Sequence, residues 1–368
     1  MQIYRMFLFL DFIIGKNYME IKHISHLKDA HNCKLFGLMP NKDEIYSFDL
    51  VNKNGMKVQI INYGATVTSI QIPVDGKLTD VVLGFDNLES YLESYNLPSA
   101  PYFGTTVGRY AGRIHNATFS LNDKKFQLDG NNNGNTLHGG PMGFGRKTWS
   151  VTDAKTGENP SITFGLLSEH LDENFPGEMT VYLTYTLTEE NELKLDYKAT
   201  STEDTIINLT HHSYFNLDGH DGNVLEQQMF IKSAKMLETN SDNIPTGDFT
   251  DLTDHDFDFR TTKNCPFPID NSFVVNSKTE IVAQLISLKN KLRMNVYTDQ
   301  PSVHIYVGGN CFGKLKGKEN VDYNAQSGIC FETQNFPDAP NQTHFPNAVL
   351  KKGEQYAQKT VYQFETLN

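Results

Sequence analysis

Residues 180–199 read TVYLTYTLTEENELKLDYKA, and they carry the clearest fold signal in the chain. Apolar or aromatic residues alternate with polar ones on both sides of the short polar segment 188–191. Such alternation places successive side chains on opposite faces of a strand. The stretch therefore predicts an antiparallel hairpin with one buried face.

The same pattern recurs along the chain. Residues 57–63 and 66–72 read as paired strands around Gly64, and residues 281–288 and 292–298 read as a second hairpin. The 17 Tyr and 24 Phe among 368 residues suit half-buried pleated surfaces. Only short helical stretches are expected, such as residues 88–95. We therefore predict an all-β protein, a large antiparallel β-sandwich.

The domain boundaries follow from the ends of this pattern. Residues 41–368 are expected to form a single β-sandwich domain, and residues 1–40 an N-terminal extension outside it. The apolar run at residues 6–10 is interrupted by Asp11, which makes it a weak targeting signal. It falls short of the roughly 18 apolar residues that a membrane helix requires, so we expect no membrane association.

Charge and cysteine content exclude several classes of protein. The formal net charge is −12, with no basic stripe of the kind that nucleic-acid-binding proteins carry. The four cysteines are scattered without a C-x-x-C pair, which fits neither a zinc cluster nor a disulfide framework. Reduced thiols in a cytoplasmic protein are the expected reading.

Residues 208–217, NLTHHSYFNL, contain the first candidate site. Two adjacent imidazoles stand where an extended run ends, so His211 and His212 must point to opposite faces. One of them can project into a cleft as a proton donor, because an imidazole titrates near neutral pH. The other would face packing or solvent.

Glu332 is the strongest partner for such a histidine. It ends a short apolar strand in GICFETQNFPDA (328–339), just before a loop that contains Pro337. An unpaired acidic group is rarely buried without a reason. A carboxylate and an imidazole together can act as base and acid.

Three further positions carry suitable chemistry, although each also has a plain structural reading. An arginine can cover apolar neighbours with its stem, and a histidine or aspartate can simply occupy a turn. In the functional reading, the arginine binds vicinal hydroxyls or a carboxylate, the aspartate accepts from adjacent hydroxyls, and the histidine stands exposed at the rim of a cleft. The three positions are Arg113 in GRYAGRI (108–114), His138 in NTLHGG (135–140) and Asp270 in PIDNSF (268–273).

Taken together, NLTHHSYFNL, GRYAGRI, LHGG and FETQNFPDAPNQ resemble the aldose 1-epimerase (galactose mutarotase) family. The resemblance covers roughly residues 44–365 and lies in the motifs and their order. It implies a β-supersandwich with the sugar in an open cleft. It also implies interconversion of the α and β anomers of aldohexoses such as galactose and glucose, without a cofactor or a metal.

The resemblance also implies roles for individual residues. Glu332 resembles the catalytic base, His212 the catalytic acid, and His138 the histidine near the ring oxygen. The positions that resemble the ligands of the sugar hydroxyls are Arg113, Asp270 and Gln300. Phe336, Tyr214 or Trp149 are candidates for covering the apolar face of the sugar. The expected partner is a monosaccharide, and the protein is expected to be a monomer or a weak dimer.

Other functions remain open from the residues alone. A hexose-phosphate epimerase would need clustered cations, for which Arg109 and Arg113 are the close candidates. A glycoside hydrolase could use Asp270 and Glu332 as its two carboxylates. A carbohydrate-binding protein would need the cleft but no acid–base pair.

A metal site built from His138, His211 and His212 is a fourth alternative. Adjacent strand histidines diverge, so they suit a single ion poorly. The chain does not indicate which aldose is preferred.

Overall fold

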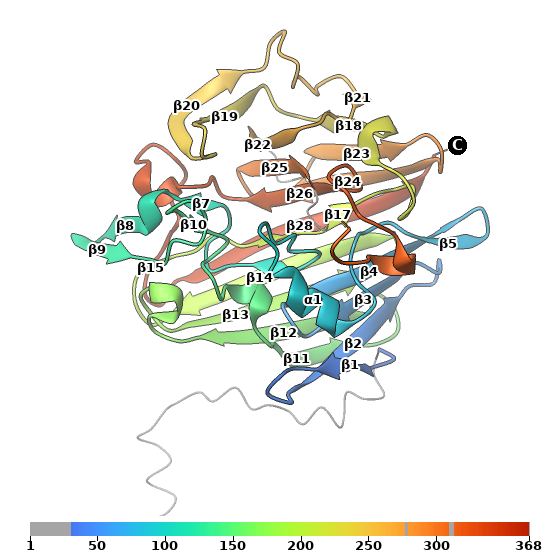
Figure 1. Ribbon diagram of the computed structural model, residues 1–368, viewed down its shortest axis with the longest axis horizontal. Coiled ribbons are helices and arrows are strands. Elements are labelled where there is room, and N and C mark those ends of the chain that lie inside the picture. The colour runs from blue at the N-terminus through green and yellow to red at the C-terminus, as the bar shows by residue number, and fades with distance from the viewer. Residues whose placement is uncertain (1–30, 277–278, 309–312, 368) are drawn as a thin grey trace, which may run out of the picture.

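The computed structural model describes residues 31–276, 279–308 and 313–367. Three antiparallel sheets dominate it, and Figure 1 shows them wrapped around a common interior. Buried side chains from all three sheets form one hydrophobic cluster, including Val58, Leu183 and Ile305. The predicted all-β sandwich is confirmed.

The largest sheet contains the hairpin that the sequence predicted. Leu183 pairs with Tyr197 across it, and both side chains are buried, whereas Lys198 on the other face is exposed. The second predicted hairpin lies in the same sheet. In spatial order its strands are β11 (Ser150–Lys155), β12 (Ser161–Ser168), β13 (Met179–Leu187), β14 (Glu192–Ser201), β28 (Gln355–Thr366), β24 (Leu292–Thr298), β23 (Ala283–Ser287), β18 (Gln228–Ile231) and β21 (Lys263–Asn264).

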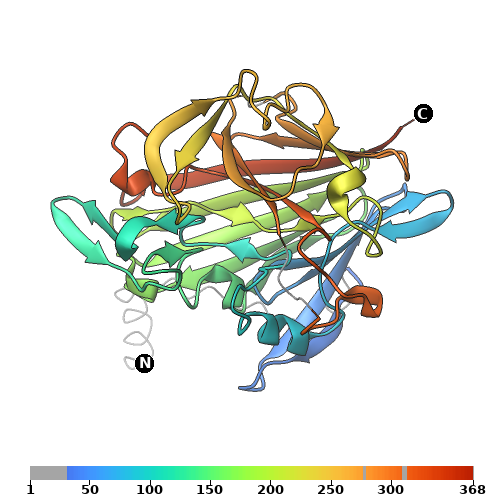
Figure 2. The ribbon, with the colours of Figure 1, turned by 45° about the horizontal axis from the view of Figure 1, so that its top comes forward.

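A six-stranded sheet lies above these long strands, as Figure 2 shows. Its inner face packs on the core through Phe273, Ile305 and Phe331. Its other face is therefore available for a site. In spatial order its strands are β17 (Tyr214–Phe215), β26 (Ile329–Gln334), β25 (Ser302–Val307), β22 (Ile269–Val274), β19 (Lys235–Thr239) and β20 (Pro245–Asp251).

The N-terminal sheet corrects the predicted domain boundary. Residues 34–38 form an edge strand of this sheet, and the His31 ring lies 3.0 Å from the Ser161 carbonyl oxygen. Residues 31–40 are thus part of the fold, and the expectation for residues 1–30 lies outside the described residues. The strands are β1 (Lys34–Leu38), β2 (Glu44–Val51), β3 (Lys57–Ile61), β4 (Thr66–Val74) and β5 (Lys77–Asp80).

The remaining elements are short. Helix α1 (Leu88–Ser94) confirms the expected helical stretch; the Asn87 side chain caps it by accepting from the Ser90 N–H. Within the described ranges, no helix is both long and apolar enough to span a bilayer. The two-stranded pairs are β6 (Thr106–Val107) with β16 (Thr210–His211), β7 (Arg113–Ile114) with β10 (Thr136–Leu137), β8 (Thr118–Leu121) with β9 (Lys124–Gln127), and β15 (Thr205–Ile206) with β27 (Val349–Leu350). Single 3-10 turns are η2 (His115–Ala117), η3 (Phe144–Arg146), η4 (Asp172–Asn174), η5 (Val224–Glu226), η6 (Lys318–Asn320) and η7 (Ala339–Asn341).

Candidate active site

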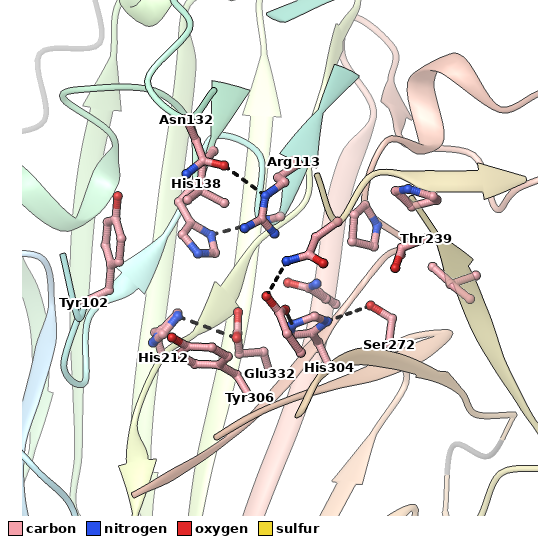
Figure 3. Close-up of a pocket in the computed structure, with 18 of the residues that line it drawn as sticks. Tyr102, Arg113, Asn132, His138, His212, Thr239, Ser272, His304, Tyr306 and Glu332 are labelled. Atoms are coloured by element: carbon pink, nitrogen blue, oxygen red, sulfur yellow. Dashed lines mark hydrogen bonds and ion pairs between the residues drawn. The ribbon is translucent and has the colours of Figure 1, made fainter. Parts of the chain in front are cut away.

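A cavity of about 820 Å³, including its open mouth, lies on the outer face of the six-stranded sheet. Its floor consists of polar side chains from β22, β25 and β26, and its walls come from loops before and after β7, β10 and β16 (Figure 3). Strand periodicity explains the floor, because every second side chain points to the same face. The floor residues are Asp270, Ser272, His304, Tyr306, Glu332 and Gln334.

Glu332 and His212 meet in this cavity, although they lie far apart in the chain. The Glu332 Oε1 atom lies 3.5 Å from His212 Nε2, and the two residues are 2% and 4% exposed. Glu332 Oε2 is buried and has no hydrogen-bond partner among the described residues. A buried carboxylate oxygen without a partner is costly. It therefore marks a place where a ligand can donate a hydrogen bond.

The two adjacent histidines point to opposite sides, as the sequence predicted. His212 lines the cavity, and its Nδ1 atom lies 3.7 Å from the buried Cys330 thiol. His211 instead contacts Ser213 Oγ at 2.7 Å and packs against the Tyr185 ring. Burial, reinforced by the neighbouring His212, lowers the pKa of His211 to about 3. His211 is therefore a neutral packing residue.

His138 lies beside His212, with the two ring centroids 5.3 Å apart and nearly perpendicular. Burial, and then the charge of His212, holds the pKa of His138 well below its ordinary value. The Gly112 backbone N–H donates to His138 Nδ1 at 3.3 Å. The proton of the neutral ring is therefore on Nε2. His138 is thus suited to donate a hydrogen bond, not to act as a cationic acid.

The same bond argues against a metal site. Ligand atoms of His138, His212 and Glu332 all lie within 4.8 Å of one another, a spacing that could hold an ion. A metal-bound imidazole needs a free lone pair on its ligating nitrogen. The Gly112 N–H occupies Nδ1 of His138, and the remaining proton occupies Nε2. His211, in the three-histidine alternative, faces away from the cavity.

Arg113 and Asn132 form one wall of the cavity. Arg113 Nε donates to Asn132 Oδ1 at 3.1 Å. Figure 3 shows the guanidinium pointing into the cavity beside His138. Arg109, by contrast, is buried elsewhere and donates to the Pro176 carbonyl and to Ser168 Oγ. The two arginines of GRYAGRI therefore do not form a cationic pair for a phosphate.

Asp270 belongs to an ordered chain of hydrogen bonds on the floor. His304 Nε2 lies 2.8 Å from Asp270 Oδ1, and His304 Nδ1 lies 2.8 Å from Ser272 Oγ. Asn243 Nδ2 donates to Asp270 Oδ2 at 2.8 Å. These contacts hold the carboxylate in one orientation, with lone pairs left over for a ligand.

The Asp270–His304 pair also sets the charges of both groups. Burial alone would raise the pKa of Asp270, but the His304 hydrogen bond and charge outweigh it, and the net shift is downward. Burial alone would lower the pKa of His304, but Asp270 outweighs it, and the net shift is upward. Asp270 is thus ionised, as a ligand of hydroxyl groups should be. The general acid of a glycoside hydrolase would need a raised pKa instead.

The structure does not bring Gln300 to this cavity, which corrects one expectation. Its side-chain amide donates to Asp299 Oδ1 at 2.8 Å, and the residue lines a separate depression with Tyr356. Gln300 lies in the turn before β25. The β25 residues that line the cavity, His304 and Tyr306, lie within the strand itself. Gln334, at the end of β26, is the glutamine that lines the cavity.

Of the three aromatic residues expected to cover the sugar, one lines the cavity and two do not. Tyr214 lines the cavity, whereas Trp149 is buried in the core with Nε1 donating to the Phe144 carbonyl. Phe336 packs in a different apolar cluster, against Phe345. The aromatic residues that the sequence reading missed are Tyr102 and Tyr306.

His304 and Gln334 are further cavity residues that sequence reasoning missed. Both positions follow from strand register: His304 pairs with Glu332 across β25 and β26, and Gln334 lies two residues after Glu332. A period-two reading outward from Glu332 would have found Gln334. His304 required knowledge of which strand lies beside β26.

Comparisons with known proteins show which family this chain is similar to. A family model described as aldose 1-epimerase matches residues 46–363. Galactose mutarotase from Bos taurus is 36% identical over 343 residues, covering 90% of this chain and 97% of that protein. Aldose 1-epimerase from Escherichia coli K12 is 30% identical over 345 residues, covering 89% of this chain and 97% of that protein.

A solved structure, described as an aldose epimerase homologue from C. elegans, superimposes with a TM-score of 0.81 at 31% identity. The match covers 88% of this chain and 99% of that chain. Galactose 1-epimerase from Lactobacillus acidophilus superimposes with a TM-score of 0.79 at 25% identity, covering 92% and 99%.

Proposed function

This chain belongs to the aldose 1-epimerase family, and from that membership we propose that Glu332 and His212 are its acid–base pair. The protein is an isomerase that interconverts the anomers of aldoses such as galactose. The observation that carries the residue assignment is the 3.5 Å approach of Glu332 Oε1 to His212 Nε2 inside one cavity.

The chemistry requires two proton transfers at neighbouring atoms. A cyclic aldose is a hemiacetal, and ring opening removes the proton of the C1 hydroxyl while the ring oxygen gains one. Glu332 accepts the C1 hydroxyl proton, for which its unpartnered Oε2 is the natural acceptor. His212 transfers the Nε2 proton to the ring oxygen as the C1–O5 bond breaks.

The open-chain aldehyde then rotates about its C1–C2 bond and presents the other carbonyl face. His212 takes back the proton, Glu332 returns the other one, and the opposite anomer closes. Each positioned group is worth typically ~10²–10⁴-fold in rate. His138, a neutral donor through Nε2, supports the same ring oxygen with a hydrogen bond.

The other cavity residues would hold the sugar. Arg113 presents donors on one wall, and Asp270 presents acceptors on the floor. Leaving such a buried partner unmet costs roughly 1–3 kcal/mol. Hydroxyl positions of the substrate are therefore selected by these contacts. A 6-phosphate is disfavoured because Arg113 is the one arginine or lysine that lines the cavity among the described residues.

Location and assembly are part of the proposal. We infer a cytoplasmic protein that acts as a monomer or weak dimer on a free monosaccharide. The four cysteines are scattered without a C-x-x-C pair, which supports a reducing compartment.

Polarimetry tests the function directly. Freshly dissolved α-D-galactose and α-D-glucose should reach their equilibrium rotation at a rate proportional to enzyme concentration, and the matching 6-phosphates should show little acceleration. A clear preference for a 6-phosphate, or release of reducing sugar from a glycoside, would contradict the proposal.

A further inference from the structure

The cavity contains a second acceptor without a partner. Gln334 is 1% exposed and lines the cavity. Its Oε1 atom is buried and has no hydrogen-bond partner among the described residues. Buried side-chain oxygens are nearly always hydrogen-bonded, and an exception needs an explanation. Inside a ligand cavity, that explanation is a donor supplied by the ligand.

The backbone fixes where this oxygen stands. Gln334 pairs with Ser302 in the β25–β26 register, and its carbonyl accepts from Ser302 Oγ at 2.8 Å. Gln334 and Glu332 lie two residues apart and therefore point to the same face, with their Cα atoms about 6.6–6.8 Å apart. Glu332 Oε2 is the other unpartnered oxygen on this floor. The two acceptors thus lie next to each other along one strand.

The order of groups along β26 matches the order of atoms around a pyranose ring. His212 contacts Cys330 through Nδ1 and Glu332 through Nε2, so its ring lies on the Cys330 side of Glu332, and Gln334 lies on the other side. The proposed mechanism puts the ring oxygen at His212 and C1 at Glu332. The ring atom on the other side of C1 is C2. Gln334 therefore lies on the side of Glu332 where C2 must be.

Gly112 and Pro337, which follows Gln334 by three residues, also line the cavity. They lie close together, because a Cβ added to Gly112 would lie 2.9 Å from Pro337 Cγ. The group that suits the Gln334 oxygen is one that can donate a hydrogen bond, and on a sugar ring that group is a hydroxyl.

We propose that Gln334 Oε1 accepts a hydrogen bond from the C2 hydroxyl of the aldose and makes the enzyme selective at that carbon. This inference rests on the proposed function of the cavity. Gln334 is a specificity-determining residue in this account, and it takes no part in proton transfer.

The test is a cycle that combines one protein change with one substrate change. Polarimetry gives kcat/KM for D-galactose and 2-deoxy-D-galactose with the wild-type enzyme and with Gln334→Met, which has a similar length but no acceptor. The wild type should prefer galactose by about tenfold, the value of one good hydrogen bond. Gln334→Met should lose most of that preference. Intrinsic reactivity differences between the two sugars cancel, because both enzymes experience them.

Two controls keep the result specific. The preference between galactose and 6-deoxygalactose should be the same for both enzymes, because that change is remote from Gln334. Gln300→Leu, outside the cavity, should behave as the wild type. If Gln334→Met does not fold, Gln334→Glu keeps an acceptor at the same reach and should keep the preference against the 2-deoxy sugar.

An unchanged 2-deoxy preference in Gln334→Met, loss of that preference in Gln334→Glu, or coupling to a different hydroxyl would overturn the assignment. A wild-type enzyme inactive on galactose would instead refute the proposed function itself. The two failures are therefore distinguishable.

Discussion

Replacing Glu332 with Gln is the sharpest test of the proposed chemistry. The amide has the same shape as the carboxylate but cannot accept the C1 hydroxyl proton. A positioned general base is worth ~10²–10⁴-fold, which corresponds to about 3–5 kcal/mol of barrier at 1.36 kcal/mol per tenfold. We therefore expect kcat for galactose to fall by at least ~100-fold.

The structure also predicts what should not change. The side chain of Glu332 makes one long contact, 3.5 Å to His212 Nε2, and its Oε2 has no partner among the described residues. A neutral amide costs less to bury than a charge, but His212 loses its ion-pair partner. These two effects oppose each other, so the free energy of unfolding should change little. KM should change little, because Gln still offers hydrogen bonds to the sugar.

The assay is polarimetry of fresh α-D-galactose over a range of concentrations, with thermal unfolding followed by circular dichroism. Glu190→Gln, at an exposed position in the turn between β13 and β14, is the matched control and should have wild-type kinetics. If Glu332→Gln kept a kcat within threefold of the wild type, Glu332 would not be the base. If the variant unfolded, Glu332 would be needed for folding, which would contradict the expected unchanged stability.

Three further outcomes follow from other contacts. His212→Asn should lower kcat by about 100-fold or more in polarimetry. His211→Asn should mainly lower Tm, because His211 packs against Tyr185. Equal, mild effects on kcat for both variants would contradict the assignment of His212 as the acid. His304→Leu removes the hydrogen bond that orients Asp270. It should raise KM for galactose about tenfold, with a smaller effect on kcat. An unchanged KM would refute the role of His304 in orienting Asp270. Burial would raise the pKa of Asp80, but Lys318 and His220 outweigh it and lower it to about 2 from 3.8. The stabilisation is thus present above about pH 4 and is lost as pH falls toward 2. Between pH 4 and pH 2, denaturant unfolding should show that the wild type loses about 2 kcal/mol more than the Asp80→Asn/Lys318→Met variant.

Local patterns were sufficient to predict much of the fold. Residues 180–199 specify a hairpin because alternation and a polar turn are properties of neighbouring residues, and β13 and β14 pair as that pattern requires. The boundary at residue 40 was wrong for a related reason. Residues 34–38 have no strong alternation of their own, and their strand exists because β2 offers an edge to pair with.

The site residues likewise divide into those that the sequence could predict and those that required the structure. Adjacency in a strand forces His211 and His212 apart, so one had to face away from any shared cleft, and this required no coordinates. Gln300 was a wrong choice because a turn before β25 and a position within β25 are indistinguishable by composition. His304 could not be found at all without the register that sets it opposite Glu332.

By itself the sequence determined the strand-rich class, the opposed histidines and a chemically competent set of acid, base and hydroxyl ligands. Tertiary structure alone decided which of them share a cavity, since β16, β22, β25 and β26 come from distant parts of the chain. It also decided the states of these groups. The proton position on His138 depends on the Gly112 N–H, and the orientation of Asp270 depends on His304. Burial and cross-strand neighbours set both, and neither is a property of nearby residues in the chain.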